Sequence, residues 1–165
     1  MSLFSSRAEG AYGKEFVREA AAVATRLGVP SEWLLAAMAW ETGWPPGFKS
    51  KGPPWPVNPG DNGFGLIGFT PGKDKQGHPF PPQTLPQFFR GPVEQLADVE
   101  SHYLGLDEET RRQHVSSPGR LLHNYSRTVW DRQARFLPYG RWIKQRAGPD
   151  DISQLSQASR FVGCA

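Results

Sequence analysis

Cysteine is almost absent from this chain of 165 residues, whose one cysteine, Cys164, stands next to the C-terminal alanine. A disulfide within the chain is therefore excluded. No apolar run approaches the roughly 20 residues that span a bilayer, and residues 1–7 lack the apolar core of a secretory signal. We therefore expect no membrane insertion. If the protein acts outside the cytoplasm, it must be exported by another route or as part of a larger chain.

Long blocks of like charge are also missing, and the formal net charge is only +3. The mild basic excess suits nucleic acid, an anionic membrane face or an acidic polysaccharide, and it does not choose between them. A chain of this length with 38% hydrophobic residues can build one core. No internal repeat or linker divides it. We expect a single domain over residues 1–165, with residues 1–13 as a flexible N-terminal segment.

β-Branched residues are absent from the most apolar stretch of the chain, residues 31–41. Its Leu, Ala and Met residues favour a helix, and Pro30-Ser31 supplies the start, with Glu32 as a capping residue in the first turn. A helix that is apolar on every side is buried on every side, so we expect the central helix of the fold here. Glu41, at its end, shares a face with Leu34, Ala37 and Met38. We expect poor hydration to raise the pKa of its carboxyl group.

Further helices are predicted from apolar residues at helical spacing. One covers residues 14–27 and ends at Gly28 as a left-handed cap. Another starts at Gly91-Pro92. Others are expected from Pro118-Gly119, over residues 139–147 and over residues 150–160. Their apolar positions are Phe16, Val17, Ala20, Val23, Ala24 and Leu27; Val93, Leu96, Ala97, Tyr103 and Leu104; Leu121, Leu122 and Tyr125; Tyr139, Trp142 and Ile143; and Ile152 and Leu155.

Residues 43–87 hold most of the 16 prolines and half of the 18 glycines, so a long helix is excluded there. The same stretch contains several aromatic residues, which a flexible linker would not. It is therefore predicted to be an ordered, functional loop region. Residues 63–69 alternate enough to form a short strand or hairpin.

Two motifs stand about twenty residues apart: Ala-Trp-Glu-Thr-Gly at 39–43 and Asn-Gly-Phe-Gly-Leu-Ile-Gly-Phe-Thr-Pro at 62–71. Together they resemble the lysozyme-like superfamily of soluble lytic transglycosylases, goose-type lysozymes and phage cell-wall hydrolases. In that family a catalytic Glu, usually followed by Ser, ends a buried helix, and a Gly-Leu-Met-Gln segment lines the sugar cleft. Glu41 matches the Glu, and residues 65–67 match Gly-Leu-Met. The resemblance covers roughly residues 14–104.

The chain departs from this pattern at three places. Gly68 replaces the family's glutamine, Thr70 stands where goose-type enzymes often carry an acidic residue, and the Ala-Tyr-Asn motif has only a distant echo in Asn124-Tyr125-Ser126. The resemblance implies a mainly α, lysozyme-like α+β fold, with a central buried helix, surrounding helices and a short β-hairpin or loop region that forms the sugar cleft. The three departures leave the subfamily open.

Glu41 fits the general acid that protonates a glycosidic oxygen. Asp61 is a candidate base or water-positioning residue, and equally a turn residue in a Pro-Gly-Asp-Asn sequence. Substrate contacts are expected from Trp44, Phe64, Gly65, Leu66, Thr70 and Tyr125. Trp55 and Phe69 are further stacking candidates, and each aromatic alone is more often a core residue. The four histidines lack metal-ligand spacing, so we expect neither a metal nor another cofactor.

Residues 14–42 also match a helix-turn-helix, but residues 31–43 contain no Lys or Arg to contact DNA. We therefore expect no nucleic-acid partner. The sequence favours a monomeric muramidase that hydrolyses the β-1,4 bond between N-acetylmuramic acid and N-acetylglucosamine in peptidoglycan glycan strands. It would be a lone domain or part of a longer effector or phage protein. A lytic transglycosylase that forms 1,6-anhydromuramic ends is the first alternative, and a non-catalytic wall-binding module is the second.

Overall fold

The computed structural model describes residues 2–43, 46–105 and 132–145. Its helices are α1 (Leu3–Tyr12), α2 (Lys14–Leu27), α3 (Ser31–Glu41), the 3-10 turns η1 (Pro82–Thr84) and η2 (Pro86–Phe89), and α4 (Pro92–Tyr103). Residues 132–145 form a further helix. Extended pairing in this part of the chain is limited to two isolated antiparallel bridges, Phe64 with Phe69 and Lys73 with Pro79. The expectation of a mainly helical protein is confirmed.

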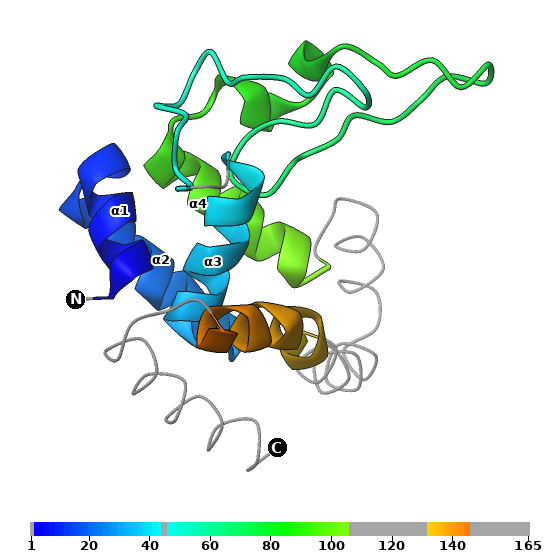
Figure 1. The fold of residues 1–165 in the computed structure, drawn as a ribbon. Coiled ribbons are helices and arrows are strands. Elements are labelled where there is room, and N and C mark those ends of the chain that lie inside the picture. Colours follow the sequence, from blue (N-terminus) through cyan, green and yellow to red (C-terminus); the bar gives the residue numbers. More distant parts are fainter. Residues whose placement is uncertain (1, 44–45, 106–131, 146–165) are drawn as a thin grey trace, which may run out of the picture.

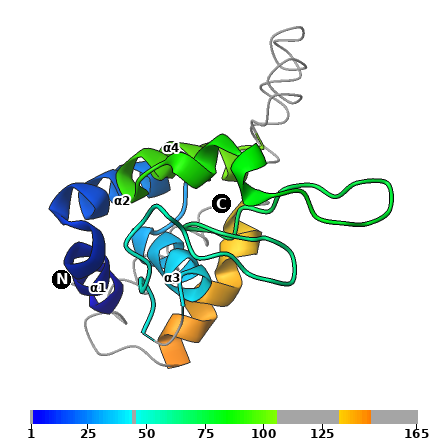
Figure 2. The ribbon, with the colours of Figure 1, turned by 90° about the horizontal axis from the view of Figure 1, so that it is seen from above.

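α3 is the centre of the described structure, as its composition predicts. In Figure 1 it stands upright with α1 and α2 to its left and α4 running behind it, and the loop region of residues 46–89 lies above its C-terminal end. Figure 2 looks along α3 and shows the helix of residues 132–145 covering another of its sides. Every residue of α3 from Glu32 to Ala39 is buried. Packing on all sides therefore explains why this helix can be apolar all round.

The last turn of α3 differs from the prediction. Trp40 is 52% exposed, and Glu41 is exposed as well. α3 ends where the chain turns into the loop region, so its last two side chains project beyond the layer of surrounding helices. Uniform burial of this helix is therefore wrong for its C-terminal end.

The N-terminal residues form α1, so the expectation of a flexible segment over residues 1–13 is wrong. Ser2 caps the helix by accepting a hydrogen bond from the backbone N–H of Ser5. Phe4 and Ala8 are buried against the core. The Glu32 carboxylate does not cap α3 and instead accepts hydrogen bonds from the hydroxyl groups of Ser2 and Ser5. Burial and these hydroxyl donors hold in place a segment whose apolar residues are not gathered on one clear helical face.

α2 and α4 pack against one another and behave largely as their spacing predicts. Gly28 ends α2 with φ of 75°, the left-handed conformation expected of a glycine cap. In α4, Leu96 is buried as expected, but Ala97 is exposed and Gln95 is buried in its place. The inward face of α4 is thus rotated relative to the apolar stripe that the sequence predicts.

The helix of residues 132–145 begins earlier than the predicted helix of residues 139–147. It crosses α3 so closely that a Cβ atom added at Gly140 would lie 2.5 Å from the ring of Trp33. The helices expected from Pro118-Gly119 and over residues 150–160 lie outside the described residues. Within the described ranges, no helix combines the length and apolar character that crossing a membrane requires.

Candidate active site

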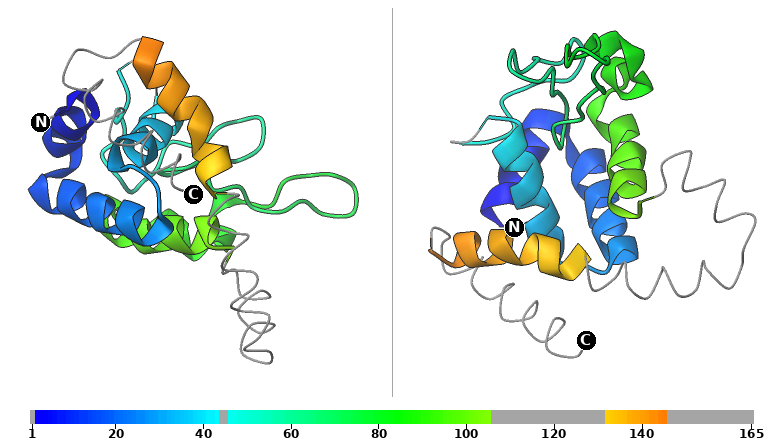
Figure 3. Two further views of the ribbon diagram at one scale, coloured as in Figure 1. Left: turned by 90° about the horizontal axis from the view of Figure 1, so that it is seen from below. Right: turned by 90° about the vertical axis from the view of Figure 1, so that its right-hand side faces the viewer.

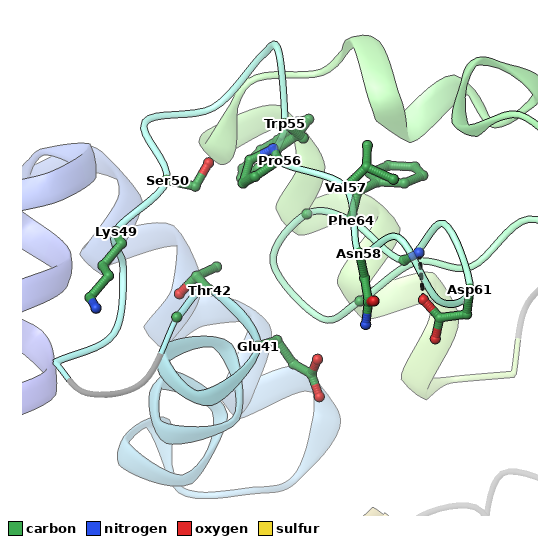
Figure 4. A pocket seen from close by; sticks show the side chains of 14 residues that line it. Glu41, Thr42, Lys49, Ser50, Trp55, Pro56, Val57, Asn58, Asp61 and Phe64 are labelled. Atoms are coloured by element: carbon green, nitrogen blue, oxygen red, sulfur yellow. Dashed lines mark hydrogen bonds between the residues drawn. The ribbon is translucent and has the colours of Figure 1, made fainter.

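A cleft of about 430 Å³ opens between the C-terminal end of α3 and the loop region (Figure 4). Its wall combines carboxylate, amide, hydroxyl and ammonium groups with parts of aromatic and proline side chains, a mixture that suits a polar ligand with apolar faces. The lining residues are Glu41, Thr42, Gly43, Lys49, Ser50, Trp55, Pro56, Val57, Asn58, Asp61, Gly63, Phe64, Gly65 and Gly68. The two candidate catalytic residues therefore line one cavity.

Glu41 projects into this cleft from the last residue of α3. Its carboxylate lies against the Gly-rich turn, since a Cβ atom added at Gly68 would be 2.8 Å from Glu41 Oε2. Partial desolvation by the cleft wall raises the pKa of the Glu41 carboxyl group, and the negative charge of Asp61 raises it further. The pKa of Glu41 is thus raised, as the sequence predicts, although the side chain is more exposed than predicted. The charge of Asp61 adds to the effect of desolvation.

Thr42 fixes the position at which α3 ends. Thr42 is buried. Its hydroxyl Oγ1 donates a hydrogen bond to the carbonyl oxygen of Met38 over 2.6 Å and accepts one from the backbone N–H of Phe48 over 2.8 Å. These two bonds join the last turn of α3 to the returning loop. The threonine at the position of the family's serine therefore helps to orient the adjacent Glu41.

Asp61 has two roles at once. Its Oδ1 accepts a hydrogen bond from the backbone N–H of Gly63 over 2.8 Å, the arrangement expected of a turn residue. Its carboxylate also faces the cleft, toward the part of the cavity that Glu41 enters. The two interpretations left open by the sequence are compatible, because only one oxygen is used by the turn bond.

The Gly-rich segment forms a tight turn that is closed by two backbone hydrogen bonds between Phe64 and Phe69, of 3.0 and 2.7 Å. This is a single antiparallel bridge, shorter than the expected hairpin. Gly65 and Gly68 have φ values of 77° and 70°, which favour glycine. The turn can therefore bring its backbone up to the Glu41 carboxylate.

Gln95 supports this turn from beneath, and sequence reasoning missed it. The side chain is fully buried; its Oε1 accepts from the backbone N–H of Leu66 over 2.7 Å, and its Nε2 donates to the carbonyl oxygen of Gln87 over 2.9 Å. A Cβ atom at Gly65 would lie 2.5 Å from Gln95 Oε1, so the glycine is needed for this approach. Little in the sequence indicates this role, because the predicted apolar stripe of α4 does not place Gln95 on the inward face.

Several expected substrate contacts require correction. Phe64 and Gly65 line the cleft, but Leu66 is fully buried and packs in the core, and Thr70 is exposed outside the cleft with its hydroxyl donating to the Gly68 carbonyl. The aromatic residues Trp55, Phe64 and Phe69 are at most 7% exposed. None of these three rings can offer an open face to a sugar. Trp44 and Tyr125 lie outside the described residues.

Two tyrosines that the sequence did not single out lie within the electrostatic reach of Glu41. Tyr103 on α4 and Tyr139 on the helix of residues 132–145 both have raised pKa values, mainly because of burial and further because of the Glu41 charge. Burial also lowers the pKa of His102, with the charge of Arg135 acting in the same direction. Both hydroxyl groups therefore stay neutral in the field of the Glu41 carboxylate.

In the part of the chain that the structure describes, no three His, Cys, Asp or Glu side chains are grouped so that they could hold a metal ion. Comparison of the chain with protein-family models, with curated proteins and with solved structures found no match.

Proposed function

We propose that this protein is a peptidoglycan-cleaving glycosidase, a muramidase with a lysozyme-like fold. It would hydrolyse the β-1,4 bond between N-acetylmuramic acid and N-acetylglucosamine in the bacterial cell wall. One observation carries the proposal: a carboxyl group with a raised pKa enters an open cleft at the end of the central helix, against the Gly-rich turn. The resemblance of the two sequence motifs to the lysozyme-like superfamily points in the same direction.

Glu41 would act as the general acid. A glycosidic bond breaks when its oxygen is protonated while an oxocarbenium-like transition state develops. A carboxyl group with a raised pKa retains its proton at higher pH and can transfer it at that moment. Tyr103 and Tyr139, whose pKa values are raised by burial and by the Glu41 charge, remain neutral and cannot act as acids in its place.

Asp61 would act as the second carboxylate. An inverting enzyme needs a base that activates water across the sugar from the acid, and a retaining enzyme needs a nucleophile in a closer position. Asp61 lines the same cleft and has one oxygen that the turn bond to Gly63 does not use. Its presence favours hydrolysis over attack by the sugar's own hydroxyl group, which needs no second carboxylate.

The remaining wall of the cleft fits a glycan better than a charged ligand of one sign. Asn58 and Ser50 offer hydrogen-bonding groups, and the Lys49 side chain lies at the opposite end of the cleft from Asp61. The net charge of +3 suits an anionic cell wall. We propose peptidoglycan glycan strands as the partner on this basis, and the periplasm or the extracellular wall as the place of action.

Digestion of purified peptidoglycan, followed by mass spectrometry of the soluble fragments, tests the proposal. We expect muropeptides with reducing ends from the wild-type protein and none from Glu41→Gln, at concentrations where Glu15→Gln, an exposed change on α2, remains fully active. Fragments with 1,6-anhydro ends would show that the reaction is transglycosylation and not hydrolysis. An absence of fragments from the folded wild-type protein, or full activity of Glu41→Gln, would refute the proposed function.

A further inference from the structure

Trp40 is the one tryptophan among the described residues with a large exposed surface, and it immediately precedes Glu41. Its exposed fraction is 52%, whereas Trp33 and Trp55 are each 3% exposed. Exposing half of an indole ring gives up apolar burial that would otherwise stabilise the fold. An aromatic surface of this size beside a candidate general acid calls for a functional explanation.

The Trp40 ring is held in place from one side. The ring of Trp142 packs against it with centroids 5.8 Å apart and an interplanar angle of 85°. Trp142 in turn packs on Phe4, with centroids 5.7 Å apart. Trp40 is therefore not a mobile surface side chain, because a chain of aromatic contacts connects it to the core through α1.

Trp40 and the cleft lie on different sides of Glu41. Successive residues of a helix are about 100° apart, so Trp40 and Glu41 project in different directions. Seven residues separate Trp33 from Trp40, which places both on the face of α3 that the helix of residues 132–145 covers, with Gly140 against Trp33. Trp40 does not line the 430 Å³ cleft, which lies toward the loop region. Figure 3 shows the loop region at one end of α3 and the helix of residues 132–145 crossing the side of α3.

A glycosidic bond at Glu41 requires a sugar ring on each side of the scissile oxygen. The cleft toward the loop region accounts for one side. The exposed ring of Trp40, the residue before the acid, lies on another side of Glu41 and outside the cleft. The C–H-rich face of an amino-sugar ring matches the apolar face of an indole, and the fixed ring would lose little conformational entropy on binding.

We propose that Trp40 forms a second sugar-binding site, which stacks on an N-acetylated amino sugar of the same glycan strand outside the cleft, beside Glu41. This inference rests on the proposed function, because it takes the ligand to be a glycan that passes Glu41. It identifies the binding platform with the residue that precedes the acid, and not with Trp55, Phe64 and Phe69, whose rings are buried.

Binding of N-acetylglucosamine oligomers tests the site without requiring catalysis. In a Glu41→Gln background, isothermal titration calorimetry should give affinities that rise from the disaccharide to the hexasaccharide as both sides become filled. Trp40→Ala in that background should weaken hexasaccharide binding by about tenfold, the value of one lost stacking contact of about 1.4 kcal/mol. Disaccharide binding should be unchanged. Phe89→Ala, a matched change at a 65% exposed aromatic on η2, should leave both affinities unchanged.

A second measurement needs no destabilising variant. The indole N–H resonance of Trp40, assigned with Trp40→Phe, should shift with the hexasaccharide and not with the disaccharide. Unchanged hexasaccharide affinity in Trp40→Ala, or an unshifted resonance, would overturn the proposal. Wall digestion by the wild type separates the two claims. Digestion with no effect of Trp40 would retain the enzyme and refute the second site, whereas Trp40-dependent binding without digestion would retain the site and refute the enzyme.

Discussion

Replacing Gln95 by leucine should destabilise the protein far more than a glutamine-to-leucine change at the surface. The Gln95 side chain is fully buried and bonds two backbone groups, the N–H of Leu66 and the carbonyl oxygen of Gln87. Leucine has a similar volume but offers neither an acceptor nor a donor. The Gln87 carbonyl keeps a second bond, from the backbone N–H of Arg90, but the buried N–H of Leu66 would have no partner. A buried donor without a partner costs about 1–3 kcal/mol, so the free energy of unfolding should fall by about that amount.

Urea denaturation followed by tryptophan fluorescence measures this difference, with Gln76→Leu as the control. Gln76 is exposed, and its backbone N–H donates to the Asp74 carboxylate. This bond does not involve the side chain that is replaced. Its replacement should change the stability by less than about 0.5 kcal/mol. Equal stabilities of the two variants would refute the inference that Gln95 supports the Gly-rich turn. Because this turn lies against Glu41, Gln95→Leu should also lower the rate of wall digestion.

Three further predictions follow from the packing and from the charge of Glu41. Gly140→Ala should destabilise the fold by about 1–3 kcal/mol, because the added methyl group meets the Trp33 ring. Gly10→Ala, with open space around it in α1, should instead stabilise the fold by about 0.5–1 kcal/mol. Calorimetry that ranks the two variants in the opposite order would contradict this packing. Phe4→Ala should cost about 3–5 kcal/mol of unfolding free energy because Phe4 is 2% exposed, and a cost below 1 kcal/mol would mean that α1 is not part of the core. The raised pKa of Glu41 means that its ionised form destabilises the folded chain, so Glu41→Gln should raise the melting temperature at pH 7 and leave it unchanged in acid, where both side chains are neutral; a lower melting temperature at pH 7 would contradict this sign.

The sequence predicts the helices wherever burial is determined by local pattern. α2 and α3 begin and end as their apolar spacing and their Pro30 and Gly28 boundaries indicate. α4 starts at Gly91-Pro92 for the same reason. These helices carry enough apolar residues to define an inward face without knowledge of their neighbours.

The errors occur where tertiary contacts decide. The apolar residues of α1 are not gathered on one clear helical face, and its order depends on Phe4 in the core and on two serine hydroxyl groups that donate to Glu32. Gln95 replaces Ala97 on the inward face of α4 because a buried turn supplies partners for its amide. Trp40 is exposed because α3 extends beyond its covering helices at this end. None of these partners can be identified from residues near in the sequence.

The candidate site could be predicted in outline and not in detail. Glu41, Asp61 and the Gly-rich segment belong to one cleft, as the two motifs predict. Trp55, Phe64 and Phe69 were candidate sugar contacts because of their residue type. They instead form the core that orders a Pro- and Gly-rich stretch. Residue type alone does not distinguish an aromatic that packs from one that binds.

The ionisation of Glu41 tests the central claim most directly. Carbon-detected NMR of the side-chain carboxyl, titrated against pH in the wild-type protein, should give a pKa above the ordinary value for glutamic acid. Asp61→Asn should lower this pKa, because it removes the neighbouring negative charge while the asparagine oxygen can still accept the turn bond from Gly63. A Glu41 carboxyl that titrates at or below the ordinary value would contradict its assignment as the proton donor.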